Sequence, residues 1–332
     1  MTTGIADKKI AIVGAGRMGR GIALSFALAG AKAVLFDLKV RDDAARARFD
    51  HANEEAFKLD LAQSVKLGLI SEKGQKKVRD RITLAANADR ATREADLIFE
   101  AVPEHRDAKI AAFAWIDANF PQDTLVASTT STFLVDDIAG MISNPSRFAN
   151  AHWLNPAHLM PLVEISKGSQ SADATIEALR QVLEAAGKTT VVCGPTPGYI
   201  VPRIQALAMN EAARLAEEGA ASVEDIDTAI RVGFGVRYAI LGLLEFIDWG
   251  GGDILYYASD YLSKNVDEHR YAAPAVIHHN MENRRNGVAD GRGFYDYAGV
   301  DIAAYRLKRM HEFAALLAHL KLTPKISDDA KE

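Results

Sequence analysis

Residues 8–37 constrain the fold of this chain most strongly, because they place a glycine cluster between a strand and a helix. KKIAIVGAG (8–16) is a short apolar run that ends in glycines, residues 17–30 carry helical apolar spacing, and AKAVLFD (31–37) is a second apolar run. Two strands joined through a helix run parallel in one sheet. The segment therefore predicts a strand–helix–strand unit at the start of an α/β domain.

Gly14, Gly16 and Gly19 fit the pattern GxGxxG at that strand–helix turn. Gly14 permits the tight turn, Gly16 lets the backbone approach a pyrophosphate, and Gly19 allows close helix packing. The amides at the helix N-terminus then face the phosphate charge. Glycines that only pack a helix on a sheet are the alternative. The position of the motif favours a dinucleotide-binding loop, which includes Met18.

Asp37 ends the second strand, 23 residues after Gly14. A carboxylate at that spacing accepts hydrogen bonds from the adenosine ribose and repels a 2′-phosphate. The sequence therefore predicts NAD in preference to NADP, although Lys39 and Arg41 are close enough to soften that preference. A bound dinucleotide indicates hydride transfer.

Apolar runs recur after this first unit and alternate with helical stretches, which favours a parallel sheet covered by helices. The further strand candidates are 95–102, 124–128, 147–152, 161–166 and 188–193. The charged stretch from about 41 to 81 is longer than a crossover needs. We interpret it as a helical pair inserted into the sheet domain.

The pattern changes after GPTPGY (194–199), where long helical stretches follow at 200–218, at 223–232 and onward to about 320. A chain of 332 residues also exceeds the usual single domain. We therefore predict a Rossmann-type α/β domain over residues 1–194 with a helical insertion, and an all-α domain over residues 195–322.

The charge distribution and the single cysteine limit the possible partners and compartment. The formal net charge is −5, and Lys and Arg are scattered among Asp and Glu, so we expect no nucleic acid partner. No apolar run approaches the ~18 residues of a membrane span. Cys193 cannot form an internal disulfide, which suits a reducing compartment. These features predict a cytoplasmic protein without a membrane partner.

The stretch HWLNPAHLMPLVE places His152 and Glu164 on either side of an Asn155–Pro156 pair. Oxidation of an alcohol needs a base for the hydroxyl proton, and the proton affinity of histidine lies near neutrality. A carboxylate on the far ring nitrogen fixes the tautomer and stabilises the imidazolium. This role requires His152 and Glu164 to lie on adjacent runs of chain. A buried histidine with an ordinary hydrogen-bond partner is the alternative.

His105 and His158 extend this pair to a set of residue types that can ligate metals. Their spacing matches no usual zinc pattern. We therefore predict no metal site.

The chain resembles the L-3-hydroxyacyl-CoA dehydrogenase family, with its L-gulonate 3-dehydrogenase/lambda-crystallin and carnitine dehydrogenase relatives. The resemblance covers nearly the whole length, from KKIAIVGAGRMGRGIA to GRGFYDY. It also includes EAVPE (100–104), STTS (128–131), HWLNPAHLMPLVE (152–164), TPGYIVPR (196–203) and EDIDTAI (224–230). It implies a Rossmann-type NAD domain, a helical C-terminal domain that mediates homodimerisation, a catalytic pair matching His152 and Glu164, and a place in fatty acid metabolism.

The resemblance also implies roles for four further residues. Ser131 matches the serine that hydrogen-bonds the substrate oxygen, and Asn155 matches the amide that helps position it. Glu104 and Lys109 align with residues near the nicotinamide half of the cofactor.

Two departures from the family pattern affect the expected substrate. Pro202 replaces an asparagine that helps orient substrate, and a proline has no side-chain donor. Asp60 stands near the position of a serine that helps hold the CoA nucleotide, where an acid would oppose a phosphate. Four lysines of the insert either supply positive charge there or form a solvated surface: Lys66, Lys73, Lys76 and Lys77.

The stretch GFGVRYAILGLLEF (233–246) resembles the relatives that oxidise free hydroxy acids. Arg237 in this stretch has the geometry to bind a substrate carboxylate bidentately, and an ion pair at a helix end or dimer interface is the alternative.

We therefore predict NAD-dependent, reversible oxidation of the C3 hydroxyl of an L-3-hydroxyacyl substrate resembling 3-hydroxybutyryl-CoA. The alternative within this class is a dehydrogenase of a free 3-hydroxycarboxylate of the L-gulonate or carnitine type. A non-catalytic, crystallin-like dinucleotide-binding protein is the third possibility.

Overall fold

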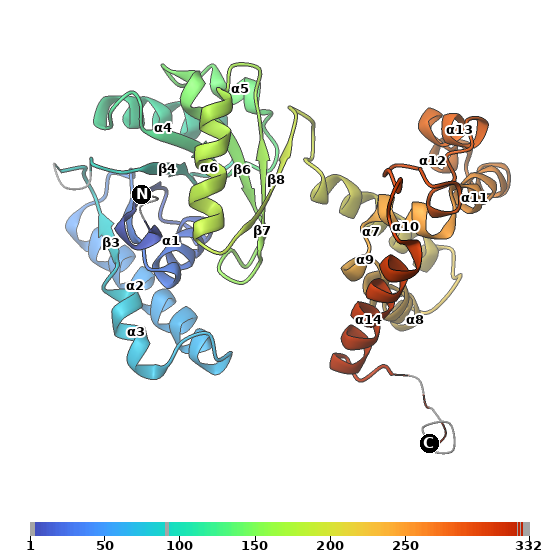
Figure 1. Cartoon of the computed structure of the whole chain (residues 1–332). Coiled ribbons are helices and arrows are strands. Elements are labelled where there is room, and N and C mark those ends of the chain that lie inside the picture. The colour runs from blue at the N-terminus through green and yellow to red at the C-terminus, as the bar shows by residue number, and fades with distance from the viewer. Residues whose placement is uncertain (1–3, 90–92, 324, 326, 328–332) are drawn as a thin grey trace. The chain divides into compact units, whose positions relative to one another are not determined.

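A computed structural model describes residues 4–89, 93–323, 325 and 327 of the chain (Figure 1). The chain divides into two compact units, Met1–Leu207 and Ala208–Glu332. Helix α7 (Val201–Glu217) contains the point of division. The predicted boundary between residues 194 and 195 lies before this helix and stays a prediction.

The first unit is built on an eight-stranded sheet with helices packed on both faces. Its strands are β1 (Lys9–Val13), β2 (Lys32–Phe36), β3 (Ile82–Ala85), β4 (Leu97–Glu100), β5 (Leu125–Ser128), β6 (Phe148–Trp153), β7 (Leu162–Ser166) and β8 (Thr189–Cys193). Its helices are α1 (Arg17–Ala29), α2 (Asp43–Lys66), α3 (Glu72–Arg79), α4 (Arg106–Asn119), α5 (Val135–Ala139) and α6 (Asp173–Ala185), with short 3-10 turns at Ile5–Asp7 and Pro145–Arg147.

The strands lie in the order β3-β2-β1-β4-β5-β6-β7-β8, and the sheet confirms the predicted Rossmann-type α/β class. Neighbouring strands are parallel except β6 and β7, which are antiparallel, so the expectation of a parallel sheet is wrong for this pair. The physical reason is the short connection between them, because a parallel crossover needs about a dozen residues or more. The sequence also gave no warning of β3, a four-residue run in which only Ile82 is fully buried.

Alternate residues of β1 build the two faces of the core. Ile10 and Ile12 join a cluster with side chains of α1 and α6, whereas Ala11 and Val13 join a cluster with side chains of α4 and α5. Successive side chains of a strand point to opposite faces of the sheet. A strand that is apolar at every position therefore needs helices on both faces, as a parallel sheet requires.

The predicted helical insertion is confirmed as α2 and α3. Asp42 caps α2 by accepting a hydrogen bond from the Ala45 amide at 2.7 Å, and Ser71 caps α3 through the Gly74 amide at 3.2 Å. The Arg79 guanidinium then joins the two helices through Glu54 at 2.5 Å. Phe57 on α2 is buried against the same core cluster as α1.

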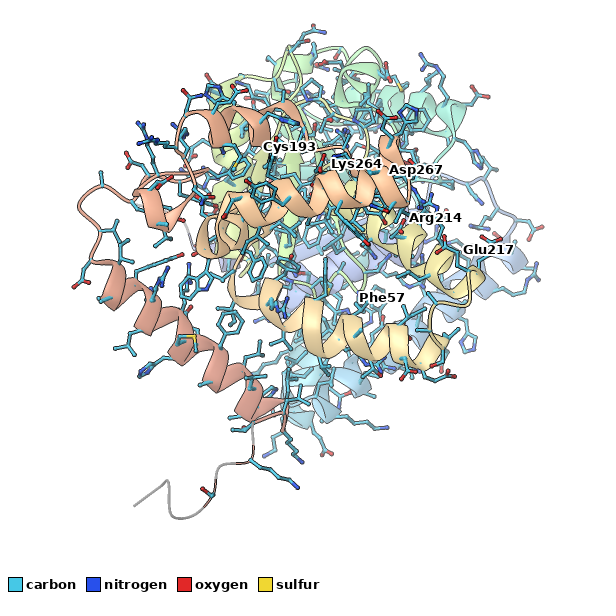
Figure 2. The ribbon with its side chains drawn as sticks, turned by 90° about the vertical axis from the view of Figure 1, so that its right-hand side faces the viewer. Phe57, Cys193, Arg214, Glu217, Lys264 and Asp267 are labelled. Atoms are coloured by element: carbon cyan, nitrogen blue, oxygen red, sulfur yellow. The ribbon has the colours of Figure 1, made fainter. Side chains whose placement is uncertain are left out.

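The regular elements of the second unit are helices throughout the part of the chain that the structure describes, as the sequence predicts, and two isolated β-bridges, Gly287–Arg292 and Arg292–Asp296, lie between them. Its elements after α7 are α8 (Val223–Ala229), a π-helical segment (Ile230–Gly235), α9 (Val236–Ile240), α10 (Leu243–Gly250), α11 (Gly252–Asn265), α12 (Glu268–Tyr271), α13 (Ala275–Glu282), a 3-10 turn (Val288–Asp290) and α14 (Ile302–His319). Figure 2 shows helices of this unit with their side chains, and it labels Arg214 and Glu217 on α7 and Lys264 on α11.

The motif GRGFYDY is anchored in this unit by one buried acid. Asp248 is 2% exposed and accepts hydrogen bonds from the Phe294 and Tyr295 amides at 2.9 and 2.8 Å. A Cβ at Gly293 would overlap the Asp248 carboxylate. The glycine is therefore needed for the close approach of this turn to α10.

Candidate active site

His152 and Glu164 lie directly opposite each other on the antiparallel strands β6 and β7. His152 Nδ1 is 2.9 Å from Glu164 Oε2, and the two side chains are 7% and 0% exposed. Residues directly opposite across an antiparallel pair have their Cβ atoms about 4.5–5.5 Å apart, so the short hairpin brings the two groups together. The sequence-based hypothesis required His152 and Glu164 to lie on adjacent runs of chain, and β6 and β7 are adjacent.

The second oxygen of Glu164 is also fully occupied. Glu164 Oε1 accepts hydrogen bonds from the Ile200 and Val201 amides at 2.9 and 2.8 Å. Burial by itself raises the pKa of Glu164, but the hydrogen bonds from His152, Val201 and Ile200 outweigh it and lower the pKa. An ionised carboxylate therefore accepts from Nδ1–H of His152, which leaves Nε2 as the basic nitrogen of the neutral ring.

Tyr199 covers the imidazole and was missed by the sequence reasoning. Its ring is stacked on that of His152, with centroids 4.7 Å apart and an interplanar angle of 16°. Its hydroxyl donates to the Thr130 carbonyl at 2.7 Å and accepts from the Asn150 amide at 3.1 Å. Burial raises the pKa of Tyr199, so it stays a neutral donor. The stretch TPGYIVPR contains Tyr199, followed directly by Ile200 and Val201, whose amides bind Glu164. Its match to the family was the signal that could have identified Tyr199.

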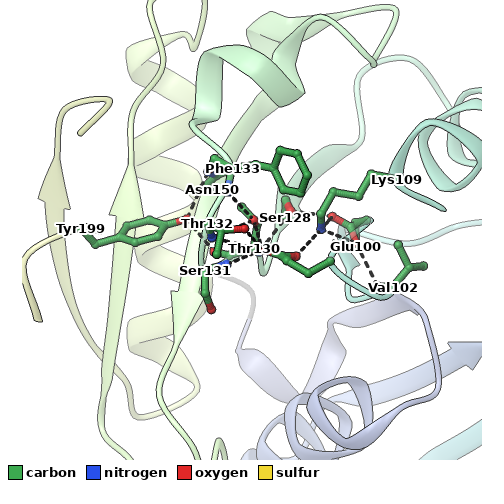
Figure 3. Close-up of polar contacts among 11 residues, drawn as sticks. Glu100, Val102, Lys109, Ser128, Thr130, Ser131, Thr132, Phe133, Asn150 and Tyr199 are labelled. Atoms are coloured by element: carbon green, nitrogen blue, oxygen red, sulfur yellow. Dashed lines mark hydrogen bonds and ion pairs between the residues drawn. The ribbon is translucent and has the colours of Figure 1, made fainter. Parts of the chain in front are cut away.

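Glu104 organises the turn that carries Ser131. Its Oε1 accepts from the Thr130 hydroxyl and from the Ser131 and Thr132 amides, the last two at 2.9 and 3.1 Å. Burial opposes ionisation of Glu104, but hydrogen bonds from Thr130 and Lys109 outweigh it and lower its pKa to about 2. In Figure 3 the Ser131 side chain projects away from this network. Glu104 thus fixes the Ser131 backbone and leaves its hydroxyl free to face another group.

Lys109 occupies the centre of a buried network (Figure 3). Its ammonium is 3.1 and 3.0 Å from the two oxygens of Glu100 and 3.0 Å from Glu104 Oε2. The Ser128 hydroxyl donates to Glu100 Oε2 at 2.5 Å, and the Val102 amide donates to Glu100 Oε1 at 2.9 Å. Lys109 is 1% exposed and Glu100 is fully buried. Any effect of Lys109 on a cofactor is therefore transmitted through Glu104 and its turn.

A pocket of about 690 Å³ opens beside the glycine loop at the carboxyl ends of β1, β2 and β4. Four of the predicted cofactor residues line it: Gly14, Gly16, Met18 and Asp37. The other three, Gly19, Glu104 and Lys109, lie outside its lining. A Cβ at Gly19 would overlap the Gly14 carbonyl oxygen, which confirms the packing role expected of that glycine.

The residues of this pocket fit NAD. Gly14 has a φ of +115°, and a Cβ there would overlap the Ala101 carbonyl oxygen, so the tight turn requires glycine. Nothing lies within 4 Å of a Cβ built on Gly16, so the backbone is open to a pyrophosphate at the N-terminus of α1. Asp37 stands at the end of β2 for the ribose. The buried pair of His152 and Glu164 and this pocket together fit the class of NAD-dependent dehydrogenases.

The chain belongs to the 3-hydroxyacyl-CoA dehydrogenase family. The family model of the 3-hydroxyacyl-CoA dehydrogenase NAD binding domain matches residues 9–196, and that of the C-terminal domain matches residues 198–297. The chain is therefore an NAD-dependent oxidoreductase of that family, which confirms the predicted family, fold class and cofactor.

Three relatives illustrate the range of similarity. The chain is 32% identical to a 3-hydroxybutyryl-CoA dehydrogenase of Bradyrhizobium diazoefficiens, over 88% of this chain and 96% of the relative. It is 30% identical to the 5-formyl-3-hydroxy-2-methylpyridine 4-carboxylate 5-dehydrogenase of Mesorhizobium japonicum, over 93% and 97%. The crystal structure of a 3-hydroxyacyl-CoA dehydrogenase of Archaeoglobus fulgidus superposes with a TM-score of 0.74 at 30% identity, over 96% and 100%.

Asn155 lies in the loop between β6 and β7 and lines the cofactor pocket beside the glycine loop. Asn155 is exposed and lines both the cofactor pocket and a second pocket of about 450 Å³. Lys188, also missed by the sequence reasoning, pins the loop by donating to the carbonyls of Ala157 and Met160 at 2.7 and 2.9 Å. Burial lowers the pKa of Lys188 to about 8. The position of Asn155 thus depends on a buried amine.

Arg237 and Pro202 complete the predicted residues. Arg237 is an exposed residue of α9, and its guanidinium lies 5.8 Å from the centroid of the Phe246 ring. Pro202 is the second residue of α7, where a missing amide is tolerated. Within the described residues, no helix is long and apolar enough to span a membrane, and no group of three metal-ligating side chains is found.

Proposed function

We propose that this chain catalyses the reversible, NAD-dependent oxidation of the C3 hydroxyl of an L-3-hydroxyacyl substrate such as 3-hydroxybutyryl-CoA. The observation that carries the proposal is the buried pair of His152 Nδ1 and Glu164 Oε2, 2.9 Å apart. The similarity to the Bradyrhizobium 3-hydroxybutyryl-CoA dehydrogenase supports this substrate class.

His152 acts as base in the oxidation and as acid in the reverse direction. Its Nε2 takes the hydroxyl proton of the substrate, while Glu164 holds Nδ1–H and stabilises the positive ring. NAD, when bound, supplies the acceptor for the hydride that leaves the same carbon. The stacked Tyr199 ring fixes the plane of the imidazole through the contact described above.

Two residues are proposed to hold the substrate oxygen. Ser131 donates its hydroxyl from the turn fixed by Glu104, and Asn155 donates its amide from the loop pinned by Lys188. Both groups polarise the C–O bond and stabilise negative charge on the oxygen in the reverse direction. We also propose that Glu104 and Lys109 support the nicotinamide end of the cofactor site through that turn.

A free 3-hydroxycarboxylate is the second candidate substrate. Asp60 lines the second pocket, where its charge opposes a CoA phosphate, although Arg17 and Arg20 line the same pocket. The relative from Mesorhizobium japonicum is named for a pyridine carboxylate rather than a CoA ester. In this version Arg237 binds the substrate carboxylate.

A substrate panel tests both versions. Initial rates with NAD are measured for L-3-hydroxybutyryl-CoA, L-3-hydroxybutyrate, L-gulonate and carnitine, with free CoA as a competitor. The first version predicts the highest kcat/KM for the CoA ester and inhibition by free CoA. Preference for a free acid without CoA inhibition supports the second version. NADH binding without turnover on the whole panel supports the non-catalytic, crystallin-like protein.

We also propose a cytoplasmic homodimer that acts in fatty acid metabolism, with residues 195–322 as the dimerisation domain. Large apolar side chains recur on one face of α11, where Ile254, Tyr257 and Tyr261 are 64%, 64% and 65% exposed. Exposed apolar patches of this kind typically mark protein interfaces. Light scattering should give twice the mass of the chain, and a Tyr257→Glu/Tyr261→Glu variant should lower it. An unchanged mass in that variant would place the interface elsewhere.

A further inference from the structure

Arg41 forms an ion pair with Asp37, the carboxylate that dinucleotide-binding motifs use to bind the adenosine ribose. Arg41 Nε is 2.6 Å from Asp37 Oδ2, and its terminal nitrogen is 3.4 Å from Oδ1. Asp37 is only 8% exposed, so the pair is largely shielded from water on the carboxylate side. The acid that would repel a 2′-phosphate is therefore neutralised by a guanidinium on the same pocket wall.

Phe49 holds Arg41 in this position. The Arg41 guanidinium lies 4.1 Å from the centroid of the Phe49 ring, within the range of a cation–π contact. Phe49 belongs to α2 of the helical insertion and also lines the cofactor pocket. Arg41 is thus fixed between β2 and the insertion, and fewer side-chain conformations are lost when it binds an anion.

The charges around this wall favour an anion. Asp37, Lys39 and Arg41 all line the pocket, which gives two cations for one acid. Asp50 on α2 also acts on Arg41, but it is paired with Arg46 at 2.9 Å. Hydrogen bonds to Asp37 use Nε and one terminal nitrogen of Arg41, so the other N–H groups remain available for a phosphate oxygen.

We propose that Arg41 makes the adenosine end of this pocket accept a 2′-phosphorylated dinucleotide as well as NAD. Arg41 serves as the specificity-determining residue, since its fork pairs Asp37 on one side and a 2′-phosphate on the other. Lys39 adds a second cation on the same wall. The inference concerns only the dinucleotide and does not depend on which hydroxyl the enzyme oxidises.

The test compares two fragments that differ by one group, 5′-AMP and adenosine 2′,5′-bisphosphate. Their dissociation constants are measured by calorimetry on the full chain, together with those of NADH and NADPH. We expect the bisphosphate to bind at least as tightly as 5′-AMP, and NADPH to bind within about tenfold of NADH. Binding of 5′-AMP more than a hundredfold tighter than the bisphosphate would overturn the proposal.

Two variants locate the effect. Arg41→Met should weaken the bisphosphate relative to 5′-AMP, and NADPH relative to NADH, by about tenfold or more, since charge-assisted hydrogen bonds to the 2′-phosphate are lost. Arg48→Met is the matched control, because Arg48 is an exposed residue of the same helix α2 and is absent from the pocket lining. An unchanged ratio in Arg41→Met, or an equal change in Arg48→Met, would refute the assignment. If Arg41→Met does not fold, the wild-type fragment ratio and Arg41→Lys decide it.

Discussion

The first unit contains two buried pairs of a basic and an acidic side chain, Lys109–Glu100 and His152–Glu164. They differ in how many of their hydrogen-bonding atoms have partners. Lys109 is 1% exposed, and its ammonium bonds both oxygens of Glu100 and one of Glu104. His152 is bonded to Glu164 through Nδ1, and among the described residues no hydrogen bond is found to its Nε2. The Lys109 ammonium therefore has all of its hydrogen-bond donors in use, whereas His152 keeps Nε2 for another partner.

Both pairs are buried, so burial does not distinguish a structural pair from a reactive one. The number of hydrogen-bonding atoms left without a partner does. A buried charge with all its hydrogen bonds formed is costly to leave without its partner, and it has no bonding group left to offer a substrate. A buried imidazole with one nitrogen uncommitted is oriented and still able to move a proton. The comparison predicts that substitutions in the first pair lower stability, whereas substitutions in the second lower turnover.

The largest expected effect is on turnover in His152→Gln. The glutamine amide can still donate to Glu164, so the fold is kept, but the group that moves the proton is lost. We expect kcat to fall by a factor of at least ~10², the scale of a positioned acid/base, with NADH affinity nearly unchanged. His311→Gln, at an exposed residue of α14, is the control and should keep full activity. Full activity of His152→Gln would refute the acid/base assignment.

The next effect is on stability in Lys109→Met. Loss of the ammonium leaves Glu100 buried and uncompensated, so we expect the free energy of unfolding to fall by about 3–5 kcal/mol. Urea denaturation measures this change. Lys58→Met breaks an exposed pair with Glu55, 62% and 53% exposed, and should leave the free energy of unfolding nearly unchanged. Equal losses in the two variants would remove the distinction between a buried scaffold pair and a surface pair.

Glu104 gives the closed network a dependence on pH. Its pKa is lowered to about 2, so its stabilising contribution is complete above the ordinary carboxyl pKa near 4.5 and is lost as pH falls toward 2. Glu104→Gln should therefore be less stable than wild type at pH 6, and the two unfolding midpoints should converge between pH 4.5 and 2. Glu104 is 35% exposed, so solvent screening reduces the effect.

The control for this pH series is Glu217→Gln, at an exposed residue of α7. Its unfolding midpoint should follow that of wild type across the same pH range. A gap between Glu104→Gln and wild type that does not narrow in acid would contradict the proposed ionisation of Glu104.

The sequence predicted the elements whose signal is local. The glycine loop, the helical insertion and the opposed positions of His152 and Glu164 follow from motif, periodicity and a short hairpin. The short strand β3 was missed, because a four-residue run carries too little periodicity to be distinguished from a loop.

The partners of the buried polar groups could not be predicted, since they join distant segments. Glu100 and Ser128 meet because β4 and β5 are paired, and Glu104 accepts from the Thr130 hydroxyl although the two residues are 26 positions apart in the chain. Resemblance placed Lys109 near the cofactor, but it gave no indication that its ammonium is enclosed by two carboxylates. Such closure depends on side-chain packing, which a single sequence does not encode locally.

The smallest expected effect tests the link between the two pairs, which is Tyr199. Its ring is stacked on His152 and its hydroxyl donates to Thr130, whose own hydroxyl bonds Glu104. Tyr199→Phe keeps the ring and removes the hydroxyl, so we expect a loss of about 1 kcal/mol in the free energy of unfolding and a small fall in kcat. Tyr199→Leu removes the stacking as well and should lower kcat further at similar KM, because the imidazole is no longer held in plane. If the two variants have the same kcat, the ring does not position His152, and the two networks act independently.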